Sequence, residues 1–339
     1  MDDAAPPPVL TARPVPPKTL PVPSTVSPQL QRSISQLAEG QALTAGPAPQ
    51  TSAEWRAFAA AADAQGLALV PHLQRMFPHT VRRYEIAGVT VREITPDSFD
   101  PRTADRVLLN FHGGGYLMNG GEASTAEAVL GAHHSGMKVI SVDYRMPPEH
   151  PFPAPLDDAL AVWSAVTADR DPASVGVFGT SAGGGLILAL TLRLKALGRP
   201  LPGALAPSTP WSDLTGASDS YAVNADVDGV FSRFDAVAQG MASLYAGATP
   251  LTDPLISPVH GDFSGFPPTI LTTGTRDILL SDTVRVYRAM RAVGVAARLE
   301  VHEAMSHAEF IYAFDCPESA VAFRDIAAFF AEHLVANPG

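Results

Sequence analysis

Residues 175–190 read VGVFGTSAGGGLILAL, and the interpretation of the whole chain starts from them. The first four residues are mostly β-branched or aromatic, which predicts a strand buried on both faces. The motif GTSAG follows at Gly179–Gly183, and the apolar run after it, through Leu194, predicts a helix. A strand, a G-x-S-x-G turn and a helix in this order are typical of a nucleophile elbow, whose serine hydroxyl stands exposed at the edge of a sheet.

The turn requires glycine at positions 179 and 183, because a side chain at Gly179 or Gly183 would collide with the neighbouring strand or helix. We expect a strained backbone at Ser181, with the free N–H groups of the following helix directed at the same point. A glycine-rich turn before a helix can instead bind phosphate. The segment has no P-loop lysine, no G-x-G-x-x-G spacing and no acidic residue at the dinucleotide-binding distance. These features favour the nucleophile, provided that partners lie elsewhere in the chain.

The composition is that of a globular enzyme. The chain has 339 residues, of which 46% are hydrophobic, enough for one large α/β domain with an appendage. Its 23 basic and 34 acidic residues give a net charge of −11, and with no basic stripe this argues against a nucleic-acid partner. Cys316 is the only cysteine, which excludes an intramolecular disulfide, and we interpret it as structural.

No targeting segment is recognisable. No apolar run reaches the length of a transmembrane helix, and residues 1–6 lack the basic and apolar regions of a signal peptide. The default expectation is a cytoplasmic protein, although a signal peptide removed ahead of this sequence stays open.

The N-terminal region differs from the rest. Nine of the first 28 residues are proline, which predicts an extended segment: a flexible tail, or an arm that packs on the body or on a second subunit of a homodimer. Residues 29–79 are expected to form a helical cap over the site. One helix is predicted around Leu30, Ile34 and Leu37, which share a face, and another from a cap at Thr51 through Ala64.

Residues 80–339 are predicted to form the catalytic domain, an α/β fold with a mostly parallel, doubly wound sheet. The predicted strands are an antiparallel pair within 80–95 and then 106–111, 137–144, 175–178, 204–207, 269–273 and 297–302. The predicted helices are 123–134, 154–166, 182–197, 281–293 and 319–334. Residues 211–252 interrupt this alternation with loops and one helix near 234–245, so we expect an insertion that contributes to the cap.

A serine hydroxyl needs a base, and an acid must orient that base. In this architecture the order along the chain is Ser, then Asp or Glu, then His. Asp277 directly follows the predicted strand 269–273, at the sheet edge where function concentrates. Asp282 is the rival, but it falls near the start of the next helix, where an acidic residue commonly only complements the helix dipole.

The candidate base is His307, which follows the predicted strand 297–302 on a sheet-edge loop. His302 lies on that strand and is interpreted as structural, and His333 lies late on the terminal helix and is interpreted as solvated. The candidate oxyanion hole is the run of three glycines after the predicted strand 106–111, in the sequence HGGGY of residues 112–116. Gly113, Gly114 and Gly115, together with the N–H of Ala182, are its predicted members.

Taken together these motifs resemble the bacterial hormone-sensitive-lipase-like esterases (family IV), a branch of the α/β-hydrolase superfamily. The resemblance extends from residue 106 to the C-terminus. It rests on HGGGY at 112–116, DYRMPPEHPFPA at 143–154, GTSAGG at 179–184, PWSDLT at 210–215, Asp277 and His307. Thr180 stands where much of the family has Asp, which resembles the GTSAG subgroup. Ala308 stands where Gly-Phe is common.

The resemblance implies a serine carboxylesterase that acts on small, short-chain acyl esters through an acyl-enzyme, without metal or cofactor. Tyr116, Trp211 and Phe310 are candidate pocket residues, although each could equally be ordinary core. Two other functions stay open: an amidase or peptidase with the same triad, and a non-catalytic ligand-binding protein of the same fold. The presence of His307 argues against the second.

Overall fold

The computed structural model describes residues 13–17, 19–39 and 47–336. Within them an eight-stranded sheet has the order β1-β2-β4-β3-β5-β6-β7-β8. The strands are β1 (His79–Ile86), β2 (Val89–Pro96), β3 (Val107–Phe111), β4 (Val139–Val142), β5 (Val175–Thr180), β6 (Ala204–Ser208), β7 (Thr269–Gly274) and β8 (Ala297–His302). β2 runs antiparallel to both of its neighbours, and the other pairs are parallel. The predicted fold, a mostly parallel sheet with an antiparallel pair at its edge, is confirmed.

Strand β5 lies in the middle of the sheet. All six of its residues are buried, as expected for a strand that is covered on both faces. Its register on β3 places Phe111 beside Gly179, so the HGGG run and the GTSAG turn leave the sheet side by side. The two motifs, about 70 residues apart in sequence, thus meet at the carboxyl edge of two adjacent strands.

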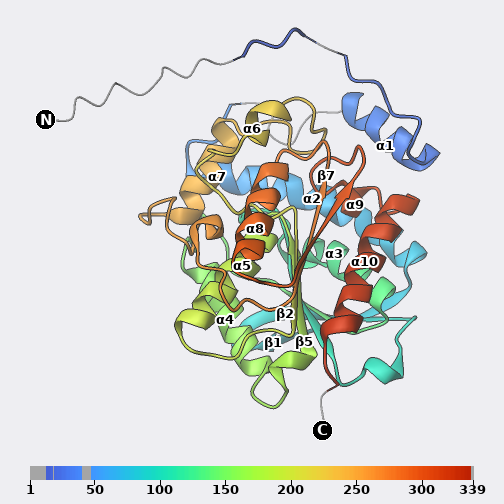
Figure 1. Ribbon diagram of the computed structural model, residues 1–339, viewed down its shortest axis with the longest axis vertical. Helices are drawn as coiled ribbons and strands as arrows, with labels where there is room; N and C mark the ends of the chain where they lie inside the picture. Colours follow the sequence, from blue (N-terminus) through green and yellow to red (C-terminus); the bar gives the residue numbers. More distant parts are fainter. Residues whose placement is uncertain (1–12, 18, 40–46, 337–339) are drawn as a thin grey trace, which may run out of the picture.

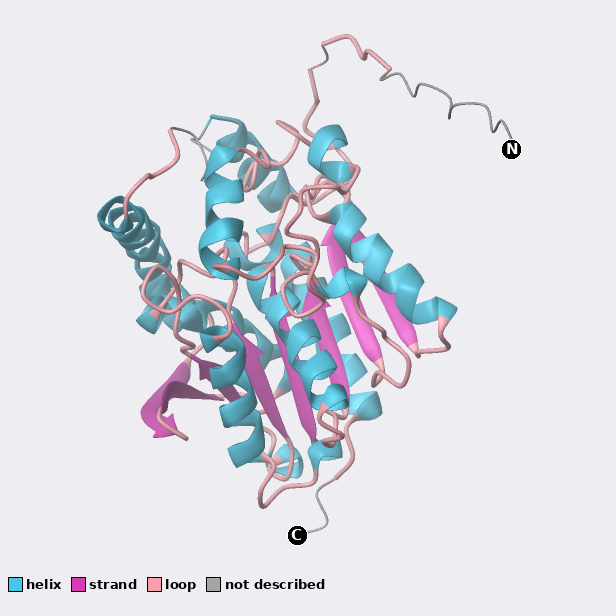
Figure 2. Cartoon of the chain, turned by 90° about the vertical axis from the view of Figure 1, so that its left-hand side faces the viewer, coloured by secondary structure: helices cyan, strands magenta, loops and turns pink. Residues whose placement is uncertain are grey.

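Helices cover both faces of the twisted sheet (Figure 2). They are α1 (Pro28–Glu39), α2 (Ser52–Met76), α3 (Thr125–Ser135), α4 (Ala154–Val166), α5 (Ala182–Ala196), α6 (Ser220–Val223), α7 (Ala236–Ala246), α8 (Leu280–Ala292), α9 (Glu309–Tyr312) and α10 (Pro317–His333). α3 and α10 pack together on one face, and α4, α5 and α8 contact the strands on the other. Each face therefore has its own apolar core, and the buried hydrophobic side chains form two separate clusters.

Helix α2 continues to Met76, beyond the predicted end at Ala64, although Pro71 lies inside it. Its start agrees with the prediction, since Thr51 and Glu54 form a capping box. Local sequence does not explain the extension. α2 packs against α3, and Leu73, beyond the proline, is almost fully buried. Tertiary packing thus maintains a helix that propensity alone would end.

Helix α2 and the insertion at 211–252 touch one another. The ring of Trp55 on α2 lies so close to Gly240 on α7 that a methyl group at position 240 would come within 2.6 Å of it. The helices α1, α6 and α7 lie at the top of the molecule in Figure 1. The insertion holds the short helix α6 in addition to the predicted one.

The last residues of the proline-rich segment are bonded to the body of the protein. The Thr25 hydroxyl donates to Glu303 at 2.6 Å, and the N–H and hydroxyl of Ser27 donate to Glu318 at 2.6 and 2.7 Å. Residues 1–12 and 18 of the predicted arm lie outside the described residues.

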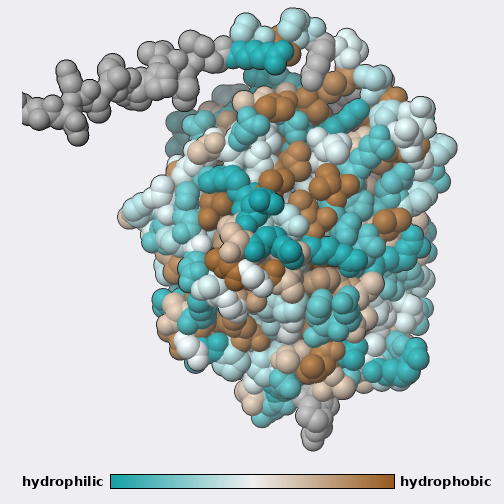
Figure 3. Space-filling view, viewed as in Figure 1, coloured by the Kyte–Doolittle hydropathy of each residue, from teal (hydrophilic) through white to brown (hydrophobic). Residues whose placement is uncertain are grey.

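The surface drawn in Figure 3 carries apolar side chains in small groups between hydrophilic ones. Among the described helices, none has both the length and the hydropathy needed to span a bilayer.

Candidate active site

The turn after β5 is built as the glycine pattern predicts. Ser181 has φ 60° and ψ −121°, a conformation that L-residues rarely adopt. A Cβ at Gly179 would come within 2.4 Å of the Phe111 carbonyl oxygen, and one at Gly183 within 1.8 Å of the same atom. The predicted backbone strain and the predicted steric need for both glycines are confirmed.

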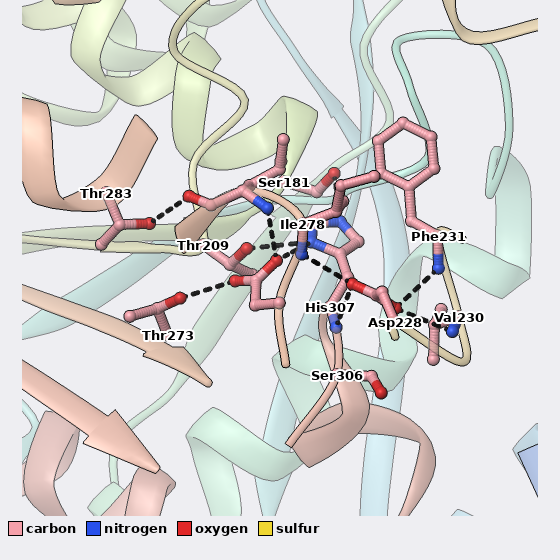
Figure 4. Close-up of polar contacts among 12 residues, drawn as sticks. Ser181, Thr209, Asp228, Val230, Phe231, Thr273, Ile278, Thr283, Ser306 and His307 are labelled. Carbon is pink, nitrogen blue, oxygen red and sulfur yellow. Dashed lines mark hydrogen bonds and ion pairs between the residues drawn. The ribbon is translucent and has the colours of Figure 1, made fainter. Parts of the chain in front are cut away.

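Three predicted side chains meet at this turn, of which Ser181 and His307 are labelled in Figure 4. The Oγ atom of Ser181 lies 2.9 Å from Nε2 of His307, and Nδ1 of His307 lies 3.1 Å from Oδ1 of Asp277. All three residues are buried, with Ser181 the most accessible at 9%. The imidazole is therefore positioned to accept a proton from the hydroxyl while the carboxylate holds its other nitrogen.

The loops after β7 and β8 position the partners of the serine. Asp277 accepts hydrogen bonds from the Thr273 hydroxyl at 2.6 Å and from the Leu279 N–H at 2.8 Å, which fix its carboxylate. His307 stands on the loop between β8 and α9. Because β7 and β8 are adjacent and parallel, the two loops leave the same edge of the sheet.

The rival residues lie elsewhere in the fold. The carboxylate of Asp282 accepts the N–H groups of Ser212 and Asp213 at 3.1 and 2.9 Å, and it thereby holds the start of the insertion. His302 ends strand β8, and His333 lies in the last turn of α10.

The electrostatics of the site favour an ion pair. Burial would lower the pKa of His307, but the hydrogen bond and charge of Asp277 outweigh it and raise the pKa above its ordinary value. Burial would likewise raise the pKa of Asp277, yet its bond to His307 and the imidazole charge keep it below the usual value. The site therefore stabilises the imidazolium that forms when His307 takes a proton.

The predicted oxyanion glycines follow β3, which lies beside the strand that ends at the serine turn. A Cβ at Gly113 would lie 3.3 Å from Cβ of Ser181, so this glycine borders Ser181 directly. Gly114 and Gly115 have φ of 117° and 60°, and the turn they form is closed by hydrogen bonds from Leu117 and Met118 to the Gly114 carbonyl. As the first residue of α5, Ala182 has an N–H without a helical partner.

Tyr144 supports this loop from behind. Its hydroxyl donates to the His112 carbonyl at 2.7 Å, and its ring stacks on the His112 ring with centroids 4.3 Å apart. His112 is buried, and burial lowers its pKa, which favours the neutral imidazole. Tyr144, in the segment 143–154, thus holds the HGGG loop through His112.

Two of the three candidate pocket residues lie close to the site. Trp211 follows β6 and donates its backbone N–H to the Ser181 carbonyl at 2.8 Å, and the Tyr116 ring stacks with the Trp211 ring at a centroid distance of 6.2 Å. Phe310 is different, because its ring packs edge-on against Phe323 of α10, in the core cluster of the opposite face. Phe310 is therefore a core residue of the α10 face. Its place in the sequence, close to His307, is compatible with a pocket residue as well as with a core residue, so the sequence could not distinguish them.

Sequence reasoning missed three polar residues around the site. Thr209 Oγ1 lies 2.9 Å from Nδ1 of His307. Glu127 on α3 accepts the Thr180 hydroxyl at 2.6 Å and the Asn110 amide at 3.0 Å, beneath the serine turn, and burial raises its pKa to about 7. Asp228 binds the His307 backbone, as described below. No motif marks these positions, because each depends on which elements pack together.

Among the described residues, no group of three or more His, Cys, Asp or Glu side chains is arranged to hold a metal ion. His307 and Asp277 instead contact one another, and His307 also contacts Ser181.

Comparison with known proteins decides the family. The family model for the alpha/beta hydrolase fold matches residues 108–311. The chain belongs to the α/β-hydrolase family. It is similar to an esterase of Acinetobacter venetianus, at 30% identity over 77% of this chain and 86% of that protein. It is also similar to an acetyl-hydrolase of Streptomyces hygroscopicus, at 31% identity over 71% of this chain and 81% of that protein.

Solved structures connect this α/β-hydrolase with the hormone-sensitive-lipase-like esterases. One esterase superposes with a TM-score of 0.92 and 36% identity over 96% of this chain and 99% of that chain. An esterase from the bacterial hormone-sensitive lipase family superposes with a TM-score of 0.78 and 30% identity over 91% and 99%. The predicted relationship to the hormone-sensitive-lipase-like esterases is confirmed.

Proposed function

We propose that this protein is a serine carboxylesterase that hydrolyses short-chain acyl esters, with Ser181 as nucleophile, His307 as general base and acid, and Asp277 as the residue that orients His307. Its relatives carry the names esterase, acetyl-hydrolase and carboxylesterase, and it is a carboxylic ester hydrolase. The observation that most supports the assignment of residues is the unbroken series of contacts from the Ser181 hydroxyl through His307 to Asp277.

The reaction proceeds in two halves. Ser181 Oγ attacks the ester carbonyl carbon while Nε2 of His307 takes its proton, and the N–H groups of Gly114, Gly115 and Ala182 stabilise the oxyanion. The bond to the alcohol then breaks, and His307 returns the proton to the leaving oxygen. A water molecule attacks the acyl-enzyme in the same way and releases the acid. No step requires a metal or a cofactor.

A short acyl chain is favoured by the large side chains near the serine. A Cβ at Gly115 would meet Sδ of Met241 at 2.7 Å, and the edge of Trp211 lies 3.8 Å from the same point. The ring of Phe231 packs edge-on against His307 at 5.6 Å. The proximity of these bulky side chains to the oxyanion loop and to His307 supports the proposed preference for short acyl chains.

The test is a panel of p-nitrophenyl esters of increasing acyl length, run on the wild type and on Ser181→Ala. We expect the highest kcat/KM with the shortest acyl groups, and a loss of about 10⁴-fold or more in kcat for Ser181→Ala. The exposed Ser35→Ala on α1 is the matched control and should keep full activity. Most of the activity remaining in Ser181→Ala would refute the assignment. Cleavage of an acyl anilide as fast as of the ester would favour an amidase.

A further inference from the structure

Asp228, in the insertion at 211–252, is a buried carboxylate that the reaction as proposed does not use; it is 2% exposed. Its oxygens accept four backbone N–H groups. Oδ1 accepts from Val230 at 2.8 Å and Phe231 at 2.9 Å, and Oδ2 accepts from Ile278 at 2.8 Å and His307 at 3.0 Å (Figure 4). One side chain therefore joins three loops that are separate in the sequence.

Two of these loops carry reacting groups. Ile278 directly follows Asp277, and His307 is the residue that bears the imidazole. The same loops are also joined at their bases, where the N–H groups of Thr275 and Arg276 donate to the carbonyls of His302 and Met305 at 3.0 and 3.1 Å. Asp228 adds the connection at the positions from which the catalytic side chains themselves extend.

The residues next to Asp228 make further contacts with the histidine loop. The N–H of Gly229 donates to the Ser306 hydroxyl at 3.1 Å, and the Phe231 ring packs against the imidazole of His307. Residues 228–231 of the insertion thus lie against the histidine loop, with polar contacts to the His307 backbone and the Ser306 hydroxyl and a ring contact to the imidazole.

We propose that Asp228 is a positioning residue of this esterase: it holds the backbone on both sides of the Asp277–His307 contact in register and places a second negative charge beside the imidazole. The inference rests on the proposed function. The carboxylates that act on His307 are Asp277 from the loop after β7, Asp228 from the insertion and Asp282 from α8. Asp277 orients the ring, whereas Asp228 binds the main chain.

The experiment compares the wild type with Asp228→Asn on p-nitrophenyl butyrate across the pH range. The amide removes the charge and keeps one accepting oxygen, so two of the four N–H groups lose their partner. We expect kcat to fall about tenfold or more, with a smaller change in KM, because the histidine is no longer held in reacting geometry. Burial raises the pKa of Asp228 to about 6, so above that pH it carries a negative charge that acts on His307. We also expect the acid limb of kcat/KM to move about half a pH unit or more to lower pH, because this charge is gone.

Asp226→Asn is the matched control. Asp226 lies two residues away, is exposed and pairs with the exposed Arg233, and its variant should keep the wild-type kcat and pH profile. A loss of packing alone would lower stability without moving the acid limb. An Asp228→Asn protein with the wild-type kcat and acid limb would therefore overturn the inference.

Ser306→Ala provides a second, milder variant, which remains informative where Asp228→Asn does not fold. It removes the acceptor of the Gly229 N–H without changing a charge. We expect kcat to fall about threefold with the acid limb in place, and an unchanged kcat would count against the inference. A wild type that cleaves no ester would overturn the proposed function itself, whereas an active wild type with unaffected variants would overturn only the role of Asp228.

Discussion

At the scale of single residues, the chemistry depends on how His307 is held. Its imidazole contacts Ser181 through one nitrogen and Asp277 through the other, and both contacts lie in a site from which water is largely excluded. Burial and the carboxylates act in opposite directions on its pKa, and the carboxylates dominate. This balance has a direct consequence for the pH dependence of the reaction.

The proposed mechanism requires a neutral His307, because only that form accepts the serine proton. With its pKa raised, His307 becomes protonated already at a pH above its ordinary 6.5. We therefore expect kcat/KM to fall, as the pH is lowered, along a limb with an apparent pKa above 6.5, and the limb to shift to lower pH in Asp277→Asn. Rates on p-nitrophenyl butyrate between pH 5 and 9 would measure it. A wild-type limb at or below 6.5 would contradict the electrostatics described above.

At the scale of elements, Glu127 links a helix to two strands below the serine turn. It extends from α3 to Thr180 at the end of β5 and to Asn110 at the end of β3. Burial raises its pKa from 4.5 to about 7, so the folded protein binds its proton more tightly than the unfolded chain does. Between these two pH values Glu127 therefore makes the free energy of unfolding decrease as the pH rises, by about 3 kcal/mol in all.

Glu127→Gln carries no charge at any pH and should lack this decrease. The quantity to compare is the free energy of unfolding of Glu127→Gln minus that of the wild type. We expect this difference to increase by about 3 kcal/mol from pH 4.5 to pH 7.5. Urea denaturation at both pH values would measure this difference. The exposed Glu122→Gln, from the turn before α3, is the control, and its difference from the wild type should stay constant. A constant difference for Glu127→Gln would show that the group does not titrate in this way.

At the scale of the whole molecule, two segments far apart in the sequence contact one another. The N-terminal helix α2 reaches the insertion through the contact of Trp55 with Gly240. The insertion in turn carries Trp211 and residues 228–231, which touch Ser181 and His307. We propose that α2 and the insertion form the predicted cap as one unit.

Trp55→Ala tests this connection. The buried indole fills the space against Gly240, so its loss should lower the free energy of unfolding by about 3 kcal/mol. If the two segments act together over the site, KM should rise more than kcat falls, because the bound ester loses contacts. Denaturation and ester kinetics would measure both. Leu67→Ala, on the exposed side of α2, should change neither. A stable Trp55→Ala with wild-type KM would separate α2 from the substrate site.

The sequence alone was sufficient for the fold and for the order of the candidate residues. The alternation of strands and helices predicted the sheet, and β5 and α5 were found close to their predicted bounds because their apolar runs are strong and local. Asp277 and His307 were predicted as site residues because each follows a predicted strand. The full length of α2 was not predictable, because packing around Leu73 keeps the helix intact beyond a proline.

What the sequence by itself determined is therefore what depends on local pattern: strand and helix periodicity, the glycines that a tight turn requires, and the residue types at the ends of strands. Only the tertiary structure decided that Asp228, Thr209 and Glu127 belong around the reacting groups, and that Phe310 belongs to the core. The physical reason is that a hydrogen bond between loops far apart in the chain depends on distance and direction in space, which no spacing along the sequence encodes.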